Sequence, residues 1–268
     1  MKKLFNIIGI ISLVIISFVY TEKTTMVVRE YDDIMINIKK QKNIEKIDSI
    51  IVEDTIIPGI LERKINIDES YMNMKKLGYY KNELLVYEKI DNKNSLKNHL
   101  DKYIISGNKS KNMVSIIFDL DWNSNINKIL EIIEENNIEV SFAVNDEWIN
   151  SNNELLNEIS KKHTILIKEK NNFNWVNMTI KKVLKKQTYC FTNEKDEDLL
   201  NICKNKKINT ILPLEINNYL IETKKNLTSG VLLSYKVNSN LENNLDMIIK
   251  YIKNRGYTIS NIVEHLEE

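Results

Sequence analysis

From Met113 onward, short apolar segments alternate with segments whose apolar residues recur at helical spacing, and this alternation constrains the fold most strongly. It predicts parallel strands joined by right-handed helical crossovers, that is, an α/β fold. Seven such units favour a closed or nearly closed barrel, and an open doubly wound sheet is the alternative. The expected strands span 113–119, 140–145, 164–168, 189–192, 209–214, 230–235 and 257–259, and the main helices 126–136, 177–185, 195–206, 217–225 and 240–254.

The N-terminus, residues 1–22, carries a predicted membrane anchor. Lys2 and Lys3 form a positive flank, and the stretch 4–20 that follows contains no charged residue. As a helix this stretch would reach roughly 25 Å, enough to cross a thin bilayer. Residues 18–21 offer no small-x-small cleavage site, which favours an uncleaved anchor over a secreted product; a hydrophobic strand is a further alternative. Because positive flanks stay cytoplasmic, we expect a single-pass protein with an extracytoplasmic C-terminal domain.

Two more segments are expected between the anchor and the alternating region. Residues 23–43 carry apolar side chains at helical spacing, which predicts a juxtamembrane stalk helix. Residues 44–111 mix short strand-like runs with one short helix, which begins at a cap formed by Asn66 with Glu69 and ends at Gly78. We expect residues 44–111 to form a small accessory module.

Charge and cysteine content exclude some classes of protein. The chain has 38 basic and 37 acidic residues, so it lacks the basic excess of a nucleic-acid-binding protein. Its three histidines leave little scope for a His-rich metal site. Cys190 and Cys203 can form one disulfide at most. Because Cys190 lies in an apolar strand-like run and Cys203 on the apolar face of the next helix, we expect two buried free thiols.

The segment that ends at Asp119 carries the main candidate site. An apolar run, residues 113–118, is followed by Asp119, Asp121 and Trp122. Barrel enzymes keep their chemistry at the C-terminal ends of their parallel strands. The two carboxylates therefore predict a catalytic or binding site there.

Five segments resemble, in order, the motifs of the polysaccharide deacetylase (NodB homology) family. The resemblance covers residues 112–268 and implies an irregular (β/α)7 barrel. The segments are Ile117–Asp121, similar to Thr-Phe-Asp-Asp-Gly; Val140–Val144, similar to Ala-Thr-Phe-Phe-Val; Lys162–Lys168, similar to Gly-His-Glu-Ile-Gly-Asn-His; Ser229–Tyr235, similar to Gly-Ser-Ile-Leu-Leu-His; and Arg255–Val263, similar to the closing Gly-Tyr strand and helix.

The resemblance also implies a metal site, from which this sequence departs. Active members hold one divalent metal, often zinc, with an Asp and two His; a second Asp is the base, and a late His protonates the leaving amine. The base position falls on Asp119. The metal-ligand Asp falls on Leu120, and the two ligand His fall on Lys168 and Asn172. The acid His falls on Tyr235. We therefore expect no metal and no other cofactor, with zinc only if the site is rearranged.

Lys168 is the substitution with the clearest physical meaning. Its ammonium would lie near the former metal position and neutralise Asp119, whose buried charge would otherwise cost free energy. The alternatives are that Lys168 is a solvated surface residue and that turn amides hold Asp119. Asp121 lies past the strand end, and His163, at the opposite barrel end, is expected to be a packing residue. The family's Arg-Pro-Pro segment falls on Thr192–Glu194, so its Arg is absent.

Three functions follow from these features. We favour a membrane-anchored, catalytically silent deacetylase-like protein that binds a cell-envelope glycan such as peptidoglycan, or an envelope protein. The alternatives are an active carbohydrate deacetylase with a rearranged site and a structural protein-interaction module. Asp119 is the candidate catalytic base. The residues expected to line the groove are Asp119, Asp121, Trp122, Trp148, Lys168, Asn172, Trp175 and Tyr235.

Overall fold

The computed structural model describes residues 2–90, 93–184 and 187–268, and the side chains of residues 2–7 fall outside that description. The chain forms two units, each with its own internal contacts. One unit comprises Met1–Lys46 and Leu61–Asp91, and the other comprises Ile47–Ile60 and Asn92–Glu268.

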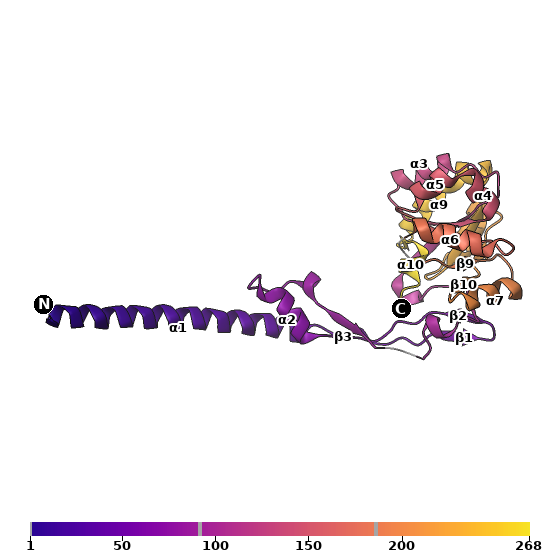
Figure 1. Ribbon diagram of the computed structural model, residues 1–268. Helices are drawn as coiled ribbons and strands as arrows, with labels where there is room; N and C mark the ends of the chain where they lie inside the picture. Colours follow the sequence, from indigo (N-terminus) through magenta and orange to yellow (C-terminus); the bar gives the residue numbers. More distant parts are fainter. Residues whose placement is uncertain (1, 91–92, 185–186) are drawn as a thin grey trace. The chain divides into compact units, whose positions relative to one another are not determined.

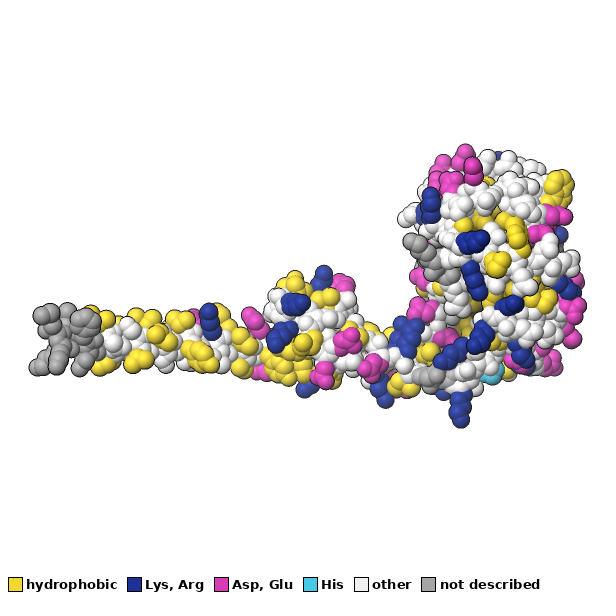
Figure 2. Space-filling model, in the orientation of Figure 1, with side chains coloured by type: hydrophobic (Ala, Val, Ile, Leu, Met, Phe, Trp, Pro, Cys, Tyr) yellow, Lys and Arg dark blue, Asp and Glu magenta, His cyan; other side chains and the backbone are white. Residues whose placement is uncertain are grey.

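A single helix, α1 (Lys2–Lys40), runs through both the expected anchor and the expected stalk (Figure 1). No proline or glycine follows Gly9 within it, so nothing in the sequence interrupts the helix. The segment Ile8–Lys40 of this helix is long and apolar enough to cross a membrane, and no residue in its most apolar stretch is buried. Figure 2 shows hydrophobic side chains along this helix. Lys2 and Lys3, on which the expected orientation rests, lie among the residues whose side chains are not described.

The rest of the first unit packs against the C-terminal part of α1. Ile34 and Ile38 of that helix form a small core with Met74. Asn66 begins the helix that carries Met74, because its side chain accepts a hydrogen bond of 2.9 Å from the Glu69 backbone N–H, as its sequence predicts. The elements of this part are β3 (Arg63–Ile65), α2 (Ile67–Lys75), η1 (Asn82–Leu84) and β4 (Tyr87–Lys89), and β3 pairs antiparallel with β4.

The second unit is built on a curled, mostly parallel sheet, which confirms the predicted α/β barrel-type fold. The strands lie in the order β1-β2-β5-β10-β9-β8-β7-β6-β12-β11, and β13 also pairs with β6. Strand β6 thus has β7 on one side and β12 on the other. The strands are β1 (Ile50–Val52), β2 (Thr55–Ile57), β5 (Tyr103–Ile104), β6 (Met113–Asp119), β7 (Ser141–Val144), β8 (Thr164–Ile167), β9 (Cys190–Phe191), β10 (Thr210–Ile211), β11 (Leu214–Glu215), β12 (Leu232–Lys236) and β13 (Thr258–Ile259).

Helices cover the outer face of this sheet, as Figure 1 shows for α3, α4, α5, α6 and α9. Asparagine and aspartate side chains begin several of them: Asn145, Asp196 and Asn238 each accept a hydrogen bond from the backbone N–H three residues on. The helices are α3 (Asn127–Glu135), α4 (Asp146–Ser151), α5 (Asn153–Ile159), α6 (Phe173–Val183), α7 (Glu197–Asn205), α8 (Tyr219–Asn226), α9 (Ser239–Asn254) and α10 (Ile262–His265), with short 3-10 turns η2 (Leu96–Asn98) and η3 (Lys109–Lys111).

Two apolar layers, one on each face of the sheet, hold the second unit together. Side chains alternate along each strand, so Phe118 of β6 joins the outer layer under the helices and its neighbour Ile117 joins the inner layer. The inner layer fills the inside of the curl. It draws on almost every strand, with Ile56, Ile104, Ile117, Ala143, Leu166, Phe191, Ile211 and Leu232, and on α10, with Ile262.

The segment expected to be an accessory module, residues 44–111, is divided between the two units. Residues 47–60 and the part from residue 93 belong with the barrel, because β2 pairs in parallel with β5 and both bury apolar residues in the inner layer. Only residues 44–46 and 61–90 remain with α1. The sequence conceals this division because the strand pairing that decides it joins Thr55 to Tyr103 across a long stretch of chain.

Cys190 and Cys203 form a disulfide, so the expectation of two free thiols is wrong. Both residues are fully buried, as expected. Cys190 lies on β9 and Cys203 on α7, the helix that follows β9, and their Cα atoms are 6.4 Å apart. The crossover folds α7 back onto the outer face of its own strand and brings the two thiols together, a geometry that the spacing of the residues does not show.

The disulfide should contribute measurably to the stability of the second unit. Its sequence separation is 13 residues, and closing a loop of that size restricts the unfolded chain by about 3 kcal/mol. We expect the double variant Cys190→Ala/Cys203→Ala to lose about that much free energy of unfolding, measured by denaturant titration. Reductant should lower the stability of the wild type similarly and leave the variant unchanged. Equal stability of the wild type with and without reductant would contradict this prediction.

Candidate functional site

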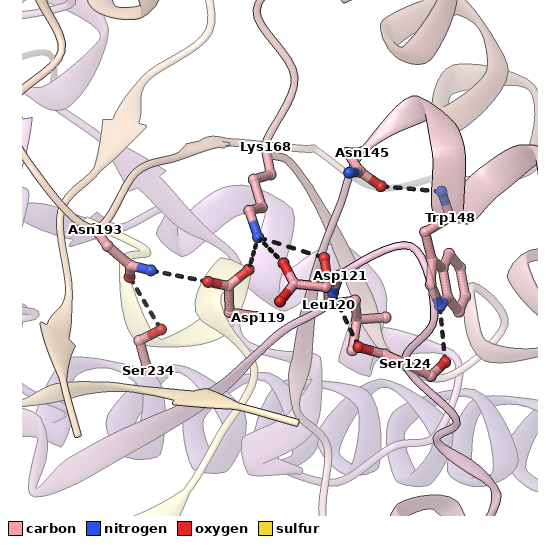
Figure 3. A network of polar contacts seen from close by, with 9 residues as sticks. All are labelled: Asp119, Leu120, Asp121, Ser124, Asn145, Trp148, Lys168, Asn193 and Ser234. Carbon is pink, nitrogen blue, oxygen red and sulfur yellow. Dashed lines mark hydrogen bonds and ion pairs between the residues drawn. The ribbon is translucent and has the colours of Figure 1, made fainter. Parts of the chain in front are cut away.

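Asp119, the last residue of β6, is the centre of the candidate site (Figure 3). It lies two residues after Ile117 and therefore points to the inner side of the curl, where it is 1% exposed. Leu120 points the other way and is fully buried in the outer apolar layer. The residue at the family's metal-ligand position is thus turned away from the site as well as lacking a donor atom.

Lys168 forms an ion pair with Asp119, as its position predicts. It follows directly after β8, and its Nζ contacts Asp119 Oδ1, lies 3.1 Å from Asp121 Oδ1 and donates to the Leu120 carbonyl at 3.4 Å. Burial lowers the pKa of Lys168, but the hydrogen bonds that its ammonium donates to Asp119 and Asp121 outweigh burial and raise the pKa above its ordinary value. Lys168 is therefore a charged ammonium whose partners hold it in place.

Asn193 holds the other oxygen of the Asp119 carboxylate. Its Nδ2 donates to Asp119 Oδ2 at 2.8 Å, and its Oδ1 accepts a hydrogen bond of 3.2 Å from Ser234 Oγ. Asn193 belongs to the segment that resembles the family's Arg-Pro-Pro, and the sequence motif alone does not predict its role in the site. Both carboxylate oxygens of Asp119 thus contact side-chain nitrogen atoms, and no turn amide is needed to hold it.

A shared strand position brings these residues together. Each lies two residues after an inner-layer core residue of its own strand, so all of them extend from the C-terminal ends of the strands toward the same space. This period of two would have identified Asn193 and Ser234 from the sequence. The pairs are Ile117 and Asp119 on β6, Leu166 and Lys168 on β8, Phe191 and Asn193 on β9, and Leu232 and Ser234 on β12.

Asp121 stands at the edge of this cluster. Its side chain is 56% exposed, and its backbone N–H donates to Ser124 Oγ at 2.9 Å. The Ser124 carbonyl in turn accepts a hydrogen bond of 3.2 Å from Trp148 Nε1. Trp148 is fully buried and contacts the loop through this hydrogen bond, so it does not line the groove as we expected.

Three other residues singled out in the sequence lie apart from the cluster. Tyr235 is fully buried in the outer layer, where its hydroxyl bonds to Thr223 Oγ1 at 2.7 Å and burial raises its pKa. Like Leu120, Tyr235 points to the outer face of the sheet, so the expectation that it lines the groove is wrong. Asn172 precedes α6 and donates to Asp146. His163 is buried against Phe142, which agrees with a packing role.

A pocket of about 310 Å³ lies beside the cluster, in the loop after β6. Trp122 is 63% exposed at this pocket. Ser124 belongs to both the pocket and the polar network of Asp121, which joins the two features. The lining contains no charged side chain; it consists of Trp122, Asn123, Ser124, Asn125, Ile126, Asn127, Asn152 and Leu155.

The donor set of this site does not fit a zinc ion. Zinc sites need several thiolate, imidazole or carboxylate ligands around one point. Here Leu120 points into the apolar layer, Lys168 presents an ammonium to Asp119, and Asn172 is turned to Asp146. Within residues 2–90, 93–184 and 187–268, no group of three or more His, Cys, Asp or Glu residues is arranged to hold a metal.

The pair should be tested by a double-mutant cycle. We expect Lys168→Met to cost about 3 kcal/mol in free energy of unfolding, because it leaves the Asp119 carboxylate buried without its cation. The double variant Lys168→Met/Asp119→Asn should recover much of that loss. Lys170→Met is the matched control, since Lys170 pairs with Asp196 and Asp198 at the surface, where solvent screens the charges, and the substitution should cost much less. Additive effects of the two site variants would show that the residues are not coupled.

Comparison with known proteins also points to the polysaccharide deacetylase family. Residues 106–208 match a family model described as polysaccharide deacetylase. The uncharacterized protein YlxY of Bacillus subtilis (strain 168) is 30% identical over 106 residues, which cover 39% of this chain but only 33% of that protein. The fold resembles the wild-type CE4 family pseudoenzyme BA3943 of Bacillus anthracis, with a TM-score of 0.66, 19% identity and coverage of 88% of this chain and 95% of that one.

A third match is the peptidoglycan N-acetylglucosamine deacetylase Bc1960, with a TM-score of 0.51, 15% identity and coverage of 62% of this chain and 95% of that one. At these identities the solved structures establish the fold. Together, the family model and the shared fold show that this chain resembles the polysaccharide deacetylase family over residues 106–208 and has the fold of CE4 proteins.

Proposed function

We propose that this protein is a membrane-anchored, catalytically silent deacetylase-like protein that binds a cell-envelope glycan, such as peptidoglycan, at the mouth of its barrel. One observation carries the catalytic part of the proposal: the ammonium of Lys168 is paired with Asp119, the residue at the base position.

Deacetylation of an amide needs an activated water, and the residues at the site do not supply one. A metal ion of the deacetylase type lowers the pKa of its bound water to about 7, whereas the pKa of free water lies far above neutral pH. An ammonium does not act as such a Lewis acid, and the raised pKa of Lys168 keeps it protonated. Asp119 is a poor base here, because both of its oxygens already contact donors, Lys168 on one side and Asn193 on the other.

The pocket in the loop after β6 supports the glycan-binding part of the proposal. An indole face attracts the C–H bonds of a sugar ring, because the π face is negative and these hydrogens carry slight positive charge. Trp122 is exposed to present such a face, and several asparagine amides surround it. The name of one fold neighbour points to the same ligand class, since it is a peptidoglycan N-acetylglucosamine deacetylase.

Helix α1 and the disulfide support an extracytoplasmic placement. The helix is long and apolar enough to serve as the anchor, and the Lys2 and Lys3 flank would stay in the cytoplasm. Disulfides such as Cys190–Cys203 persist in oxidising compartments outside the cytoplasm and are rare within it.

The orientation can be tested in bacterial cells that express the full chain. We expect the protein to remain in the membrane fraction, and protease added to cells with a permeabilised outer envelope to remove the part that follows α1. A cytoplasmic protein in the same cells serves as the control for lysis. Release of a chain that lacks the apolar segment 4–20 into the medium would rule out the proposed anchor, and full protection from protease would rule out the proposed orientation.

The proposed loss of catalysis predicts the behaviour of the detergent-solubilised full chain. It should hold no stoichiometric zinc, cobalt or nickel after metal addition and desalting, and it should release no acetate from peptidoglycan or acetylated chitooligosaccharide. Asp119→Asn is the matched variant and should give the same result. About one metal ion per chain, with acetate release that Asp119→Asn abolishes, would instead establish an active deacetylase with a rearranged site.

Glycan binding at the mouth should depend on Trp122. We expect the full chain to sediment with insoluble peptidoglycan, and Trp122→Ala to retain much less binding because it removes the exposed indole. Ile221→Ala is the control, since Ile221 is similarly exposed at 64% but lies on α8, outside the pocket. No binding by the wild type would refute the glycan-binding part of the proposal and leave an envelope protein as the partner.

A further inference from the structure

A second pocket lies on the outer, helical side of the barrel domain, between the α4–α5 segment and α6. Its volume is about 450 Å³, and α4 and α6 contact each other beside it. In Figure 2 the face over α5 and α6 carries hydrophobic and uncharged side chains with lysines beside them. The lining residues are Ile149, Asn150, Asn153, Asn157, Trp175, Thr179, Lys182 and Val183.

Three polar side chains of this pocket are free to bind a ligand, whereas Asn157 Nδ2 donates to the Asn153 carbonyl at 3.1 Å. The side-chain amides of Asn150 and Asn153 and the hydroxyl of Thr179 make no hydrogen bond to other described residues. Trp175 is 40% exposed, so part of its indole face is open to the pocket. A concave site with one aromatic face and a few unused amides and hydroxyls is the usual form of a small polar ligand site.

The composition of the lining selects the class of ligand. Three of the eight lining residues are asparagine, whereas the whole chain has 38 asparagines in 268 residues. Lys182 is the sole charged side chain in the lining, although charged residues make up 28% of the sequence. Unpaired amides, which donate and accept hydrogen bonds, suit the hydroxyl and acetamido groups of a neutral sugar, and a site with so little charge does not favour an anionic or a basic partner.

The two pockets lie on either side of one helical segment. Asn152, between α4 and α5, lines the pocket at the barrel mouth, while its neighbours Asn150 and Asn153 line the outer pocket. Each pocket has one exposed tryptophan, Trp122 in the pocket at the barrel mouth and Trp175 in the outer pocket. A ligand made of repeated similar units, as a glycan chain is, matches such a repeated arrangement.

We propose that the outer pocket is a second saccharide-binding site, in which a neutral sugar ring stacks on Trp175 and its hydroxyl or acetamido groups bond to Asn150, Asn153 and Thr179. The ligand class rests on the proposed function, but the residues are separate from those of the barrel mouth. The site adds a point of attachment to the same glycan and takes no part in any reaction.

The test measures binding of the detergent-solubilised full chain to insoluble peptidoglycan and, by calorimetry, to a long acetylated chitooligosaccharide. We expect Trp175→Ala to weaken binding about tenfold or more, as truncation of a tryptophan anchor commonly does. Asn150→Ala/Asn153→Ala should weaken it in the same direction. Met178→Ala is the matched control, because Met178 is 58% exposed on the same helix, α6, but lies outside the lining. The affinity for the acetylated chitooligosaccharide should change little with salt, since that ligand is neutral.

The outcomes separate this inference from the proposed function. If Trp122→Ala weakens binding and Trp175→Ala does not, the outer pocket is not a glycan site, and the barrel mouth remains one. If Trp175→Ala weakens binding and Trp122→Ala does not, the outer pocket is the glycan site and the mouth is not. If the wild type binds neither glycan, both proposals are refuted.

Discussion

The buried carboxylate of Asp119 is the constraint on which the candidate site depends. An ionised carboxylate that is 1% exposed is stable only if hydrogen bonds and an opposite charge replace the water it has lost. Lys168 supplies the charge and Asn193 the second contact. The charge is compensated only while the three strands β6, β8 and β9 keep their register. The contacts of Asp119 therefore link the C-terminal ends of these strands. The residue that takes the place of a metal ligand in the family's motif is therefore also part of the contacts that hold these strands together.

The overall fold could be predicted from the sequence because its signal is periodic and local. Apolar residues at helical spacing between short apolar runs define strand–helix units, and the handedness rule for parallel strands leaves few ways to assemble them. The pairing of Lys168 with Asp119 was also predictable, because a buried charge needs a partner and Lys168 falls on a ligand position. The boundary within residues 44–111 was not, because it depends on a strand pairing between residues far apart in the chain, Thr55 and Tyr103.

The details of the site show where motif comparison stops being informative. Leu120 and Tyr235 occupy family positions in the sequence, yet both side chains lie in the outer apolar layer. Asn193 and Ser234 fall on no catalytic or metal-ligand position of the family, yet they join the network because they have the same strand parity as Asp119. The side of the sheet to which a residue points decides whether it reaches the site, and its chemical type matters only after that. The disulfide was missed for a related reason, since the facing of β9 and α7 is a tertiary property.

The covalent attachment of the cation at this site has a consequence for how the domain folds. A deacetylase whose central carboxylate is neutralised by a metal completes its site only when the surroundings supply that ion, and its stability then varies with the ion's concentration. Here the positive charge belongs to Lys168, which directly follows β8, so every folded chain carries one such charge at the site. The compensation of Asp119 is therefore independent of metal supply, and chelators or competing cations have nothing to remove from the ion pair. A scaffold of this kind can keep its structure where divalent metals are scarce.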